Sequence, residues 1–413
     1  MHFEDAQKDK HVIADASVMT SGGETRTAGA AQGVALIVAS FLPLLAIVAL
    51  TVAVPRIAAH FAGSANPDLF VPVLVSAPGL SIALLSPFMG GFVDRYGRRP
   101  LLLWATGLYG LAGAAPFFLD SLPAIIASRL LLGVCESAIL TVSNTLLADY
   151  YAPARRRRWL TAQGIFGTVG GTAVIPISGL LTAWRWNGVF LVYLIALAVF
   201  AVMAKVLYEP TRRADDTAEL MGAEFPWRGV WGLALGTLYV SILYFVFIIN
   251  GGTVFGEAGV TDPAQVGRYL GVASIMIPIG SLLYGALGAR PVSVQLTVVL
   301  ALLGIGLGVI GAAHQAQWAF CGLLVQQLGA GMTVLSLIAW AQSRFRFEHR
   351  GRGMGIWASS FFLGQFVSPI LVNGARHFAG SMRGAFVVMG AVALTGCVVA
   401  AFSALRASQI LKS

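Results

Sequence analysis

The sequence predicts an all-α membrane protein in which twelve transmembrane helices form two six-helix halves. Composition is the first reason, because 57% of the 413 residues are hydrophobic and only 11% are charged, with a mean hydropathy of +0.79. A soluble protein of this length would have too little polar surface to cover its core. We therefore expect lipid to cover most of the surface. The other two reasons are a series of apolar runs and a repeated charged turn.

Twelve apolar runs are each long enough to cross a membrane, because a helix of about 20 residues spans about 30 Å of hydrocarbon. The third and fourth runs are the least clearly separated. An even number of spans places both termini on one side of the membrane. The runs lie near residues 33–57, 70–93, 100–119, 122–147, 159–183, 187–207, 229–253, 267–289, 292–313, 317–341, 353–374 and 383–405.

Arginine is unevenly distributed between the loops, and cationic loops are retained in the cytoplasm. We therefore expect a multi-pass protein of the cell membrane with both termini in the cytoplasm. The loops assigned to the cytoplasm carry Arg95, Arg98, Arg99, Arg155 to Arg158, Arg212, Arg213, Arg228, Arg290, Arg344, Arg346, Arg350 and Arg352. The opposite loops carry only Arg185, Arg268, Arg376 and Arg383, with Arg56 near the end of the first span.

The longest polar interruption, Tyr208 to Pro226, divides the chain into two sets of six spans. The first 30 residues have mixed charge and lack the basic start and apolar core of a signal peptide. The predicted organisation is a disordered cytoplasmic tail at 1–30, a six-helix bundle at 31–207, a cytoplasmic linker at 208–227, a second six-helix bundle at 228–406 and a cytoplasmic tail at 407–413.

Each half carries a similar turn after its second span. The first copy runs from Gly97 to Pro100, and the second, eroded copy runs from Gly288 to Pro291. Two six-helix halves in the same orientation, related by an internal repeat, can face one another across a cavity at the membrane midplane. This architecture permits alternating access to a bound solute.

The first turn resembles the G-x-x-x-D-R-x-G-R-R signature of the major facilitator superfamily, at the loop between helices 2 and 3 where that family carries it. The matching residues are Gly90, Asp94, Arg95, Gly97, Arg98 and Arg99. The helix 4 element R-x-x-x-G of the family is met by Arg129 and Gly133. The helix 5 element of its antiporters is only partly present: Gly171, Pro176 and Gly179 fit, whereas Ile175 and Leu180 replace glycines.

The resemblance implies a cytoplasmic gate. In the family the signature aspartate faces the cytoplasmic N-terminus of helix 11, which here contains Gly351, Gly353 and Gly355. Unpaired N–H groups and the helix dipole stabilise a carboxylate there by about 0.3 to 2 kcal/mol. We expect Asp94 to close this gate, and Arg98 to join Asp149 in it. The alternative is that the arginines of the turn only set the topology and contact lipid headgroups.

Two ionisable residues lie deep in the fourth span. Arg129 and Glu136 are seven residues apart, which places them on one helix face about 10 Å apart along the axis. Intramembrane charges are costly and face a cavity, a partner or a proton path. Glu136 is therefore the candidate proton-coupling site, with Arg129 nearby. The alternative is a fixed ion pair that holds this helix against a neighbour.

Substrate contacts are expected on helices 1, 4, 7 and 10, which line the cavity in the superfamily. The polar candidates are Tyr239, Tyr244, Asn250, Gln326 and Gln327. A helix–helix hydrogen bond is the alternative role for each. Several aromatic residues could form an apolar wall of the cavity, namely Phe245, Phe247, Trp340, Phe361 and Phe362.

Other classes of protein find no support in the sequence. The basic residues sit in short clusters between apolar runs, which is unlike a nucleic-acid-binding groove. The sequence contains neither a phosphate-binding glycine loop with its lysine nor a metal-binding cluster. We therefore expect no enzymatic activity and no cofactor, with the proton gradient as energy source.

The predicted function is secondary active transport of a small organic solute, in which the solute is exported in exchange for protons. We expect the chain to function as a monomer in the lipid bilayer. The alternatives are proton-coupled uptake of an organic acid, with Arg129 holding the carboxylate, and a receptor-like or scaffold relative that has lost transport.

Overall fold

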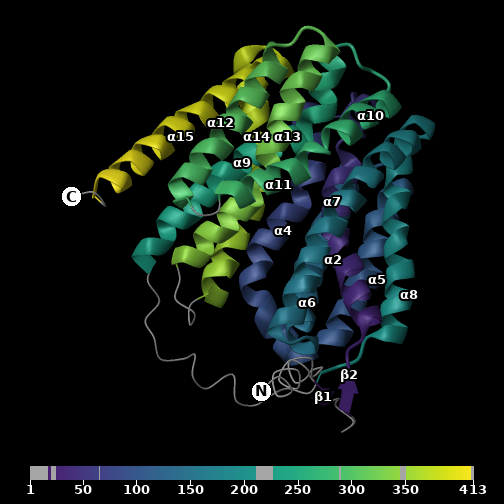
Figure 1. The fold of residues 1–413 in the computed structure, drawn as a ribbon. Coiled ribbons are helices and arrows are strands. Elements are labelled where there is room, and N and C mark those ends of the chain that lie inside the picture. Colours follow the sequence, from purple (N-terminus) through teal and green to yellow (C-terminus); the bar gives the residue numbers. More distant parts are fainter. Residues whose placement is uncertain are drawn as a thin grey trace, which may run out of the picture.

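The computed structural model describes residues 17–19, 25–64, 66–210, 227–287, 290–344 and 350–410. Helices dominate these ranges (Figure 1). The first half contains α2 (Ala30–Leu50), α3 (Val54–His60), α4 (Pro67–Tyr96), α5 (Arg98–Ala114), η2 (Ala115–Phe117), α6 (Leu122–Tyr150), α7 (Pro153–Trp184), η3 (Gly188–Leu194) and α8 (Ile195–Val206). The second half contains α9 (Trp227–Glu257), α10 (Pro263–Ala273), α11 (Met276–Leu287), α12 (Val292–Ala312), α13 (Ala316–Arg344), α14 (Arg350–Ala379) and α15 (Met382–Ile410).

Twelve helical segments of the described chain are long and apolar enough to cross a membrane, which confirms the predicted fold class. The sixth span joins η3 to α8, and the eighth joins α10 to α11. The third and fourth spans are separated by a short connection after η2. The last span ends at Leu405, as predicted, and its helix α15 continues to Ile410.

Part of the N-terminal segment that was expected to be a disordered tail is paired. The strands β1 (Ser17–Met19) and β2 (Thr25–Thr27) are antiparallel, with Ser17 opposite Thr27. Residues 1–16 and 20–24 of this segment lie outside the described residues, as do 211–226 of the predicted linker and 411–413 of the C-terminal tail.

Within each half, neighbouring helices pack closely where glycine replaces a larger side chain. In the first half, a Cβ added to Gly133 of α6 would lie 2.3 Å from the carbonyl oxygen of Pro78 in α4. In the second half, a Cβ on Gly304 of α12 would lie 3.0 Å from the carbonyl oxygen of Gly390 in α15. Small residues at such interfaces allow helix backbones to approach each other in a membrane.

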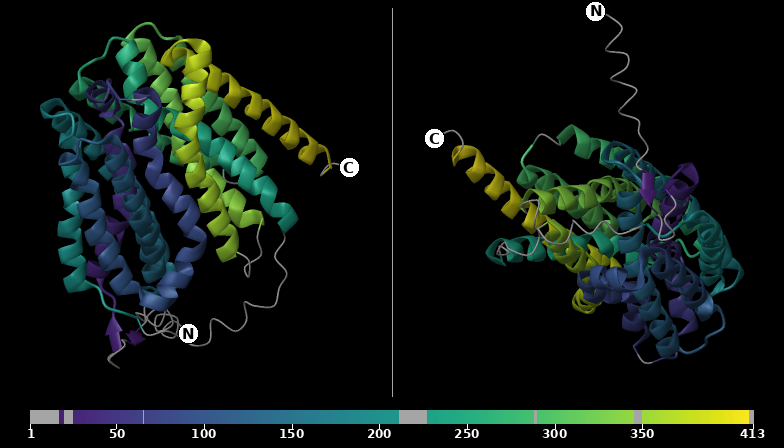
Figure 2. Two further views of the ribbon diagram at one scale, coloured as in Figure 1. Left: turned by 180° about the vertical axis from the view of Figure 1, so that it is seen from behind. Right: turned by 90° about the horizontal axis from the view of Figure 1, so that it is seen from below.

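The two halves lie side by side, and their ribbons come closest at the upper end of Figure 1 and diverge toward the lower end (Figures 1 and 2). Two hydrogen bonds between described residues join them directly. Thr51 Oγ1 donates to the carbonyl oxygen of Ile248 at 2.7 Å, and Ser274 Oγ lies 2.8 Å from Thr172 Oγ1. The second half also extends beyond the bundle, because α15 leans away from the other helices toward its C-terminus (Figure 2).

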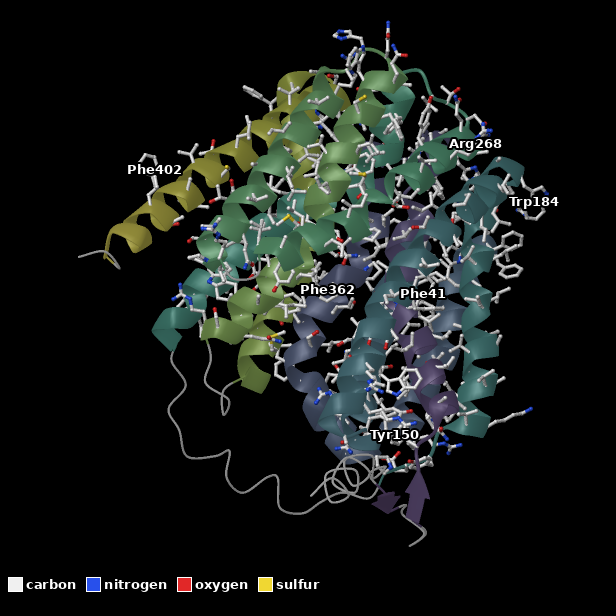
Figure 3. The ribbon with its side chains drawn as sticks, in the orientation of Figure 1. Phe41, Tyr150, Trp184, Arg268, Phe362 and Phe402 are labelled. Carbon is white, nitrogen blue, oxygen red and sulfur yellow. The ribbon has the colours of Figure 1, made fainter. Side chains whose placement is uncertain are left out.

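We call the lower end the arginine-rich end, defined by Arg95, Arg98, Arg99 and Arg155, and the other end the opposite end. In Figure 3, Tyr150 marks the arginine-rich end and Trp184 marks the opposite end. The distribution of arginine between the loops predicts that the arginine-rich end faces the cytoplasm.

Candidate functional site

The signature turn lies at the arginine-rich end, between α4 and α5. Gly97 links the two helices with a φ of 83°, a conformation that favours glycine. Directly after it, Arg98 forms an ion pair with Asp149, near the end of α6. Arg99 donates from Nη2 to the carbonyl oxygen of Ala204 in α8 at 2.8 Å. The first two arginines of α5 therefore bind it to two other helices of the same half.

Glu209, which the sequence analysis missed, completes this arrangement. Its two carboxylate oxygens accept the backbone N–H groups of Arg98 at 2.7 Å and of Arg99 at 2.6 Å. These are first-turn N–H groups that have no partner within the helix. The only signal in the sequence was an acid directly after the sixth span.

The other members of the predicted gate are placed less completely. The side chain of Asp94, in the last turn of α4, lies outside the described residues, as does the environment of Gly90. Arg95 is exposed, with its guanidinium carbon 5.6 Å from the ring centre of Tyr96. Facing α4, a Cβ on Gly355 of α14 would lie 4.0 Å from Pro87 Cα. The contact of Asp94 with the start of α14 stays a prediction.

Arg129 is fully buried inside the first half. Its Nη2 donates to the carbonyl oxygen of Gly113 in α5 at 2.7 Å. Its guanidinium carbon lies 4.6 Å from the ring centre of Tyr193 and 5.1 Å from that of Phe190. Aromatic faces stabilise a cation at such distances, and more strongly where water is excluded. These contacts hold Arg129 against α5 and η3.

Glu136 is also fully buried, and neither of its oxygens has a hydrogen-bond partner among the described residues. Arg129 lies on the same helix, but the two do not form the ion pair that the sequence left as an alternative. The exposed side of α6 nearby carries Leu131 and Val134. Glu136 therefore points into the interior of the first half.

Two buried tyrosines that the sequence analysis missed share this interior. Tyr109 of α5 donates to the carbonyl oxygen of Leu42 at 2.5 Å, and Tyr193 of η3 donates to that of Ala46 at 2.9 Å. Both acceptors belong to α2, on either side of its internal Pro43. The ring centres of Tyr109 and Tyr193 are 5.7 Å apart, and the Tyr193 ring also lies against Arg129. Four helical segments thus contribute to one polar cluster: Tyr109, Arg129, Glu136 and Tyr193, with carbonyls of α2.

Three of the predicted substrate-contacting residues have different neighbours. Asn250 donates to the Val246 carbonyl of its own helix at 3.1 Å. Gln326 is buried with its backbone against Gly306 of α12, and its amide has no partner among the described residues. Tyr239 donates to the carbonyl oxygen of Val392 at 2.5 Å.

The two remaining candidates are Tyr244 and Gln327. Gln327 is buried at 7% exposure. Tyr244 joins a group of aromatic rings, with its ring centre 4.9 Å from that of Phe245 and 5.8 Å from that of Phe361. Tyr244 is thus the candidate that lies among the predicted aromatic residues.

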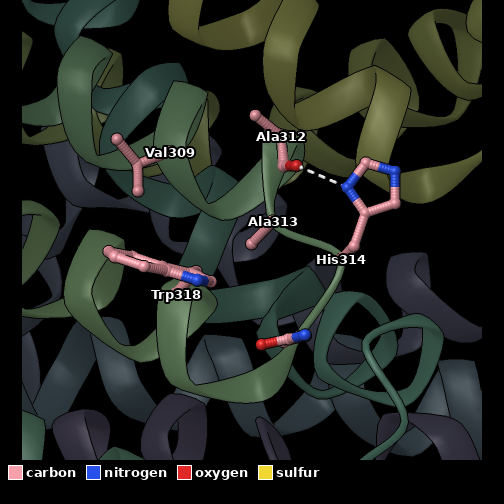
Figure 4. A pocket seen from close by; sticks show the side chains of 6 residues that line it. Val309, Ala312, Ala313, His314 and Trp318 are labelled. Atoms are coloured by element: carbon pink, nitrogen blue, oxygen red, sulfur yellow. Dashed lines mark hydrogen bonds between the residues drawn. The ribbon is translucent and has the colours of Figure 1, made fainter.

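A shallow pocket lies away from all of these residues, at the turn between α12 and α13 (Figure 4). Its lining includes Val309, Trp318 and His314, whose Nδ1 is 3.1 Å from the carbonyl oxygen of Ala312. Among the described residues, no group of three His, Cys, Asp or Glu side chains could hold a metal ion.

Comparison with known sequences places this architecture in a family. The profile of the Major Facilitator Superfamily matches residues 36–345 and 253–409. The putative metabolite transport protein YfiG of Bacillus subtilis is 25% identical over 358 residues, which covers 71% of this chain and 73% of YfiG.

Two efflux proteins are similar over shorter stretches. The multidrug efflux pump LfrA of Mycolicibacterium smegmatis is 32% identical over 165 residues, or 40% of this chain and 32% of LfrA. The multidrug export protein EmrB of Escherichia coli K12 is 29% identical over 123 residues, or 30% of this chain and 23% of EmrB. The chain therefore spans about a third or less of the length of these two relatives.

Solved structures share the fold over most of the chain. A bacterial homolog of the human lysosomal transporter Spinster, inward-facing and occupied, has a TM-score of 0.71 at 16% identity, covering 91% of this chain and 96% of that one. The nucleoside transporter NupG has a TM-score of 0.73 at 10% identity, covering 91% and 99%. With a matching family profile from residue 36 to residue 409 and the same twelve-span fold, the chain belongs to the major facilitator superfamily of transporters.

Proposed function

We propose that the chain exports a small organic solute in exchange for protons, by alternating access between its two halves. The proton gradient supplies the energy, and neither a cofactor nor an enzymatic step takes part. The protein works as a monomer in the cell membrane, with its arginine-rich end in the cytoplasm. The efflux relatives LfrA and EmrB support the outward direction.

The burial of Glu136 carries the proposal. It is the only fully buried acid among the described side chains, and its carboxylate oxygens accept no hydrogen bond there. An unpaired carboxylate in such surroundings costs several kcal/mol, whereas a protonated carboxyl costs less. Proton uptake and release at Glu136 are therefore tied to a rearrangement that brings water to it. Such a rearrangement accompanies alternating access, which gives the coupling.

The gate at the cytoplasmic end consists of Gly90, Asp94, Arg95, Gly97, Arg98, Arg99 and Asp149. The pairing of Arg98 with Asp149 supports this assignment. Tyr244, Asn250, Gln326 and Gln327 are proposed to contact the solute, and Tyr244 has the strongest support because it lies among aromatic rings at mid-length of α9.

Uptake of an organic acid is the less favoured alternative. It requires Arg129 to hold the carboxylate of the solute. The guanidinium is instead fully buried, bonded to Gly113 and placed over the rings of Phe190 and Tyr193. To reach a solute, the guanidinium would have to leave these partners and expose them as well. This cost favours a supporting role for Arg129 beside Glu136.

The test is Glu136→Gln in proteoliposomes. This variant keeps the shape of the side chain and removes its ability to exchange a proton. We expect accumulation driven by a pH gradient to be lost, while downhill exchange of labelled solute continues. Asp120→Asn is the matched control, because Asp120 is an exposed acid.

Three results would contradict the proposal. Unchanged gradient-driven accumulation in Glu136→Gln would remove this residue from coupling. Accumulation in the same direction as proton flow would indicate symport in place of antiport. Absence of labelled exchange in the wild type would indicate a relative that does not transport.

A further inference from the structure

A group of aromatic rings surrounds Phe361 of α14. Its ring centre is 5.5 Å from that of Trp357, with the two planes 19° apart. It is 5.3 Å from Phe245 and 5.8 Å from Tyr244, both on α9. Offset aromatic pairs at such distances are favourable, and the rings present flat apolar faces.

Polar groups without partners lie in the same region. Gln365 is 0% exposed, and both its amide oxygen and its amide nitrogen lack a hydrogen bond among the described residues. The indole Nε1 of Trp357 is also buried and has no hydrogen-bond partner in the described part of the chain. Buried polar groups in native proteins are nearly always hydrogen-bonded, because leaving one unpaired costs free energy. The amide of Gln365 and the indole N–H of Trp357 are therefore free to hydrogen-bond to a ligand.

Helix geometry places these residues along one strip of α14. Trp357, Phe361 and Gln365 follow one another at intervals of four residues, so they lie within an arc of about 80° and about 6 Å apart along the axis. The strip is therefore about 12 Å long from Trp357 to Gln365. Two or three fused rings have a comparable length.

Gln365 lies where three helices meet. On one side of it, Ser368 of α14 donates to the carbonyl oxygen of Ile242 in α9 at 2.8 Å. On the other side is α4 of the first half, where a Cβ on Gly79 would lie 3.0 Å from Cβ and Cδ of Gln365. Phe362 lies beside this contact, at mid-height of the molecule (Figure 3). The amide is therefore held at the boundary between the two halves.

We infer that Trp357, Phe361 and Gln365, with Tyr244, form a subsite for a planar, uncharged aromatic group that both donates and accepts hydrogen bonds. The rings supply the apolar faces. Trp357 Nε1 donates to an acceptor on the ligand, and the Gln365 amide pairs with a donor and an acceptor. These four side chains carry no charge, so the subsite does not compensate a charged ligand.

This subsite deepens the proposed function, on which it rests, by naming a class of solute. It lies mainly on α14, the eleventh span, where the sequence predicted Phe361 as a possible part of the apolar cavity wall but no polar contact with the solute. Because Gln365 touches α4, a ligand bound here contacts both halves. Binding then favours the arrangement in which the two halves approach.

Two coumarins test the subsite without a proton gradient. At mildly acidic pH, 7-hydroxycoumarin is neutral and has both a donor and a carbonyl acceptor, whereas 7-methoxycoumarin lacks the donor. Fluorescence titration of the full-length protein in lipid nanodiscs should show about tenfold tighter binding of 7-hydroxycoumarin, as expected for one hydrogen bond to an otherwise unpaired group.

Three variants locate the effect. Gln365→Leu should abolish the preference between the two coumarins. Trp357→Phe keeps an aromatic ring but removes the indole N–H, so both coumarins should bind more weakly. Gln295→Leu is the control, because Gln295 of α12 is another buried glutamine whose amide oxygen has no partner among the described residues. It should bind both coumarins as the wild type does.

The outcomes separate this inference from the proposed function. A preference that persists in Gln365→Leu, or a wild type that binds neither coumarin, would overturn the subsite. If Gln365→Leu does not fold, unchanged binding to Trp357→Phe would overturn it equally. Glu136→Gln should keep the preference, since equilibrium binding needs no coupling. Loss of coupling with intact binding would thus separate the two sites.

Discussion

Glu209 and Arg98 are joined by a hydrogen bond of 2.7 Å from the Arg98 backbone N–H to a carboxylate oxygen. The second oxygen of Glu209 accepts the N–H of Arg99, and the side chain of Arg98 pairs with Asp149. The segment after the sixth span is thereby tied to the start of the third span, and the third span to the end of the fourth. Movement of any of these segments during transport involves the other two.

Glu209→Ala should therefore destabilise the first half. Loss of a carboxylate that caps two first-turn N–H groups costs about 1 to 2 kcal/mol. Glu209→Gln, which keeps one acceptor oxygen, should lose less. The measurement is the midpoint of thermal unfolding of the purified protein in one detergent.

Glu257→Ala provides a matched control at the opposite end. The carboxylate of Glu257 accepts the N–H groups of Met382 and Arg383, each at 3.0 Å. The two alanine variants should lose similar stability. Only Glu209→Ala should also alter solvent access to the space between the halves from the arginine-rich end. Equal access in both variants would show that Glu209 only stabilises the fold.

Asp94→Ala should increase access to the space between the halves from the arginine-rich end. The predicted reason is the loss of a carboxylate bound at the start of α14. The measurement is maleimide labelling of a reporter cysteine at Ser359, in a background without Cys135, Cys321 and Cys397. Unaltered labelling would show that Asp94 does not close this end, and Asp120→Asn serves as the control.

Much of the fold was predictable because hydropathy acts locally. A helix needs only its own apolar residues to enter lipid, so all twelve spans could be located without tertiary information. The pairing of Arg98 with Asp149 rested on the family resemblance. The roles assigned to Glu136 and to the gate stay predictions.

Other parts of the site depend on contacts between distant segments. Glu209 is hydrogen-bonded to Arg98, which is 111 positions away in the sequence, and Tyr193 to Ala46, which is 147 positions away. Their residue types alone gave no reason to select them. The sequence likewise gave no reason to select Gln365, since an amide in a span is commonly bonded to a neighbouring helix. Only the structure shows that its amide has no partner among the residues it describes.

Ser274→Ala should shift the balance between conformations. It removes the hydroxyl that lies 2.8 Å from Thr172 Oγ1 across the two halves. One such bond contributes about 0.5 to 1.5 kcal/mol, so the population ratio should change by about two- to tenfold toward separation at this point. Distance measurements between spin labels on α7 and α10 would detect the shift. Ser403→Ala, on the exposed end of α15, should leave these distances unchanged.

Gly133→Leu should prevent correct packing of α6 against α4. A Cβ at this position would lie 2.3 Å from the carbonyl oxygen and 2.6 Å from Cα of Pro78, both backbone atoms that cannot rotate away. Overpacking of this kind costs about 1 to 3 kcal/mol or more, and the resulting shift of α6 would also displace Glu136. We expect a lower unfolding midpoint and, in any folded fraction, weaker gradient-driven accumulation. Gly285→Leu on α11 is the control, because a Cβ there meets nothing within 4 Å. Equal stability of the two variants would mean that the close contact between α6 and α4 does not position the buried acid.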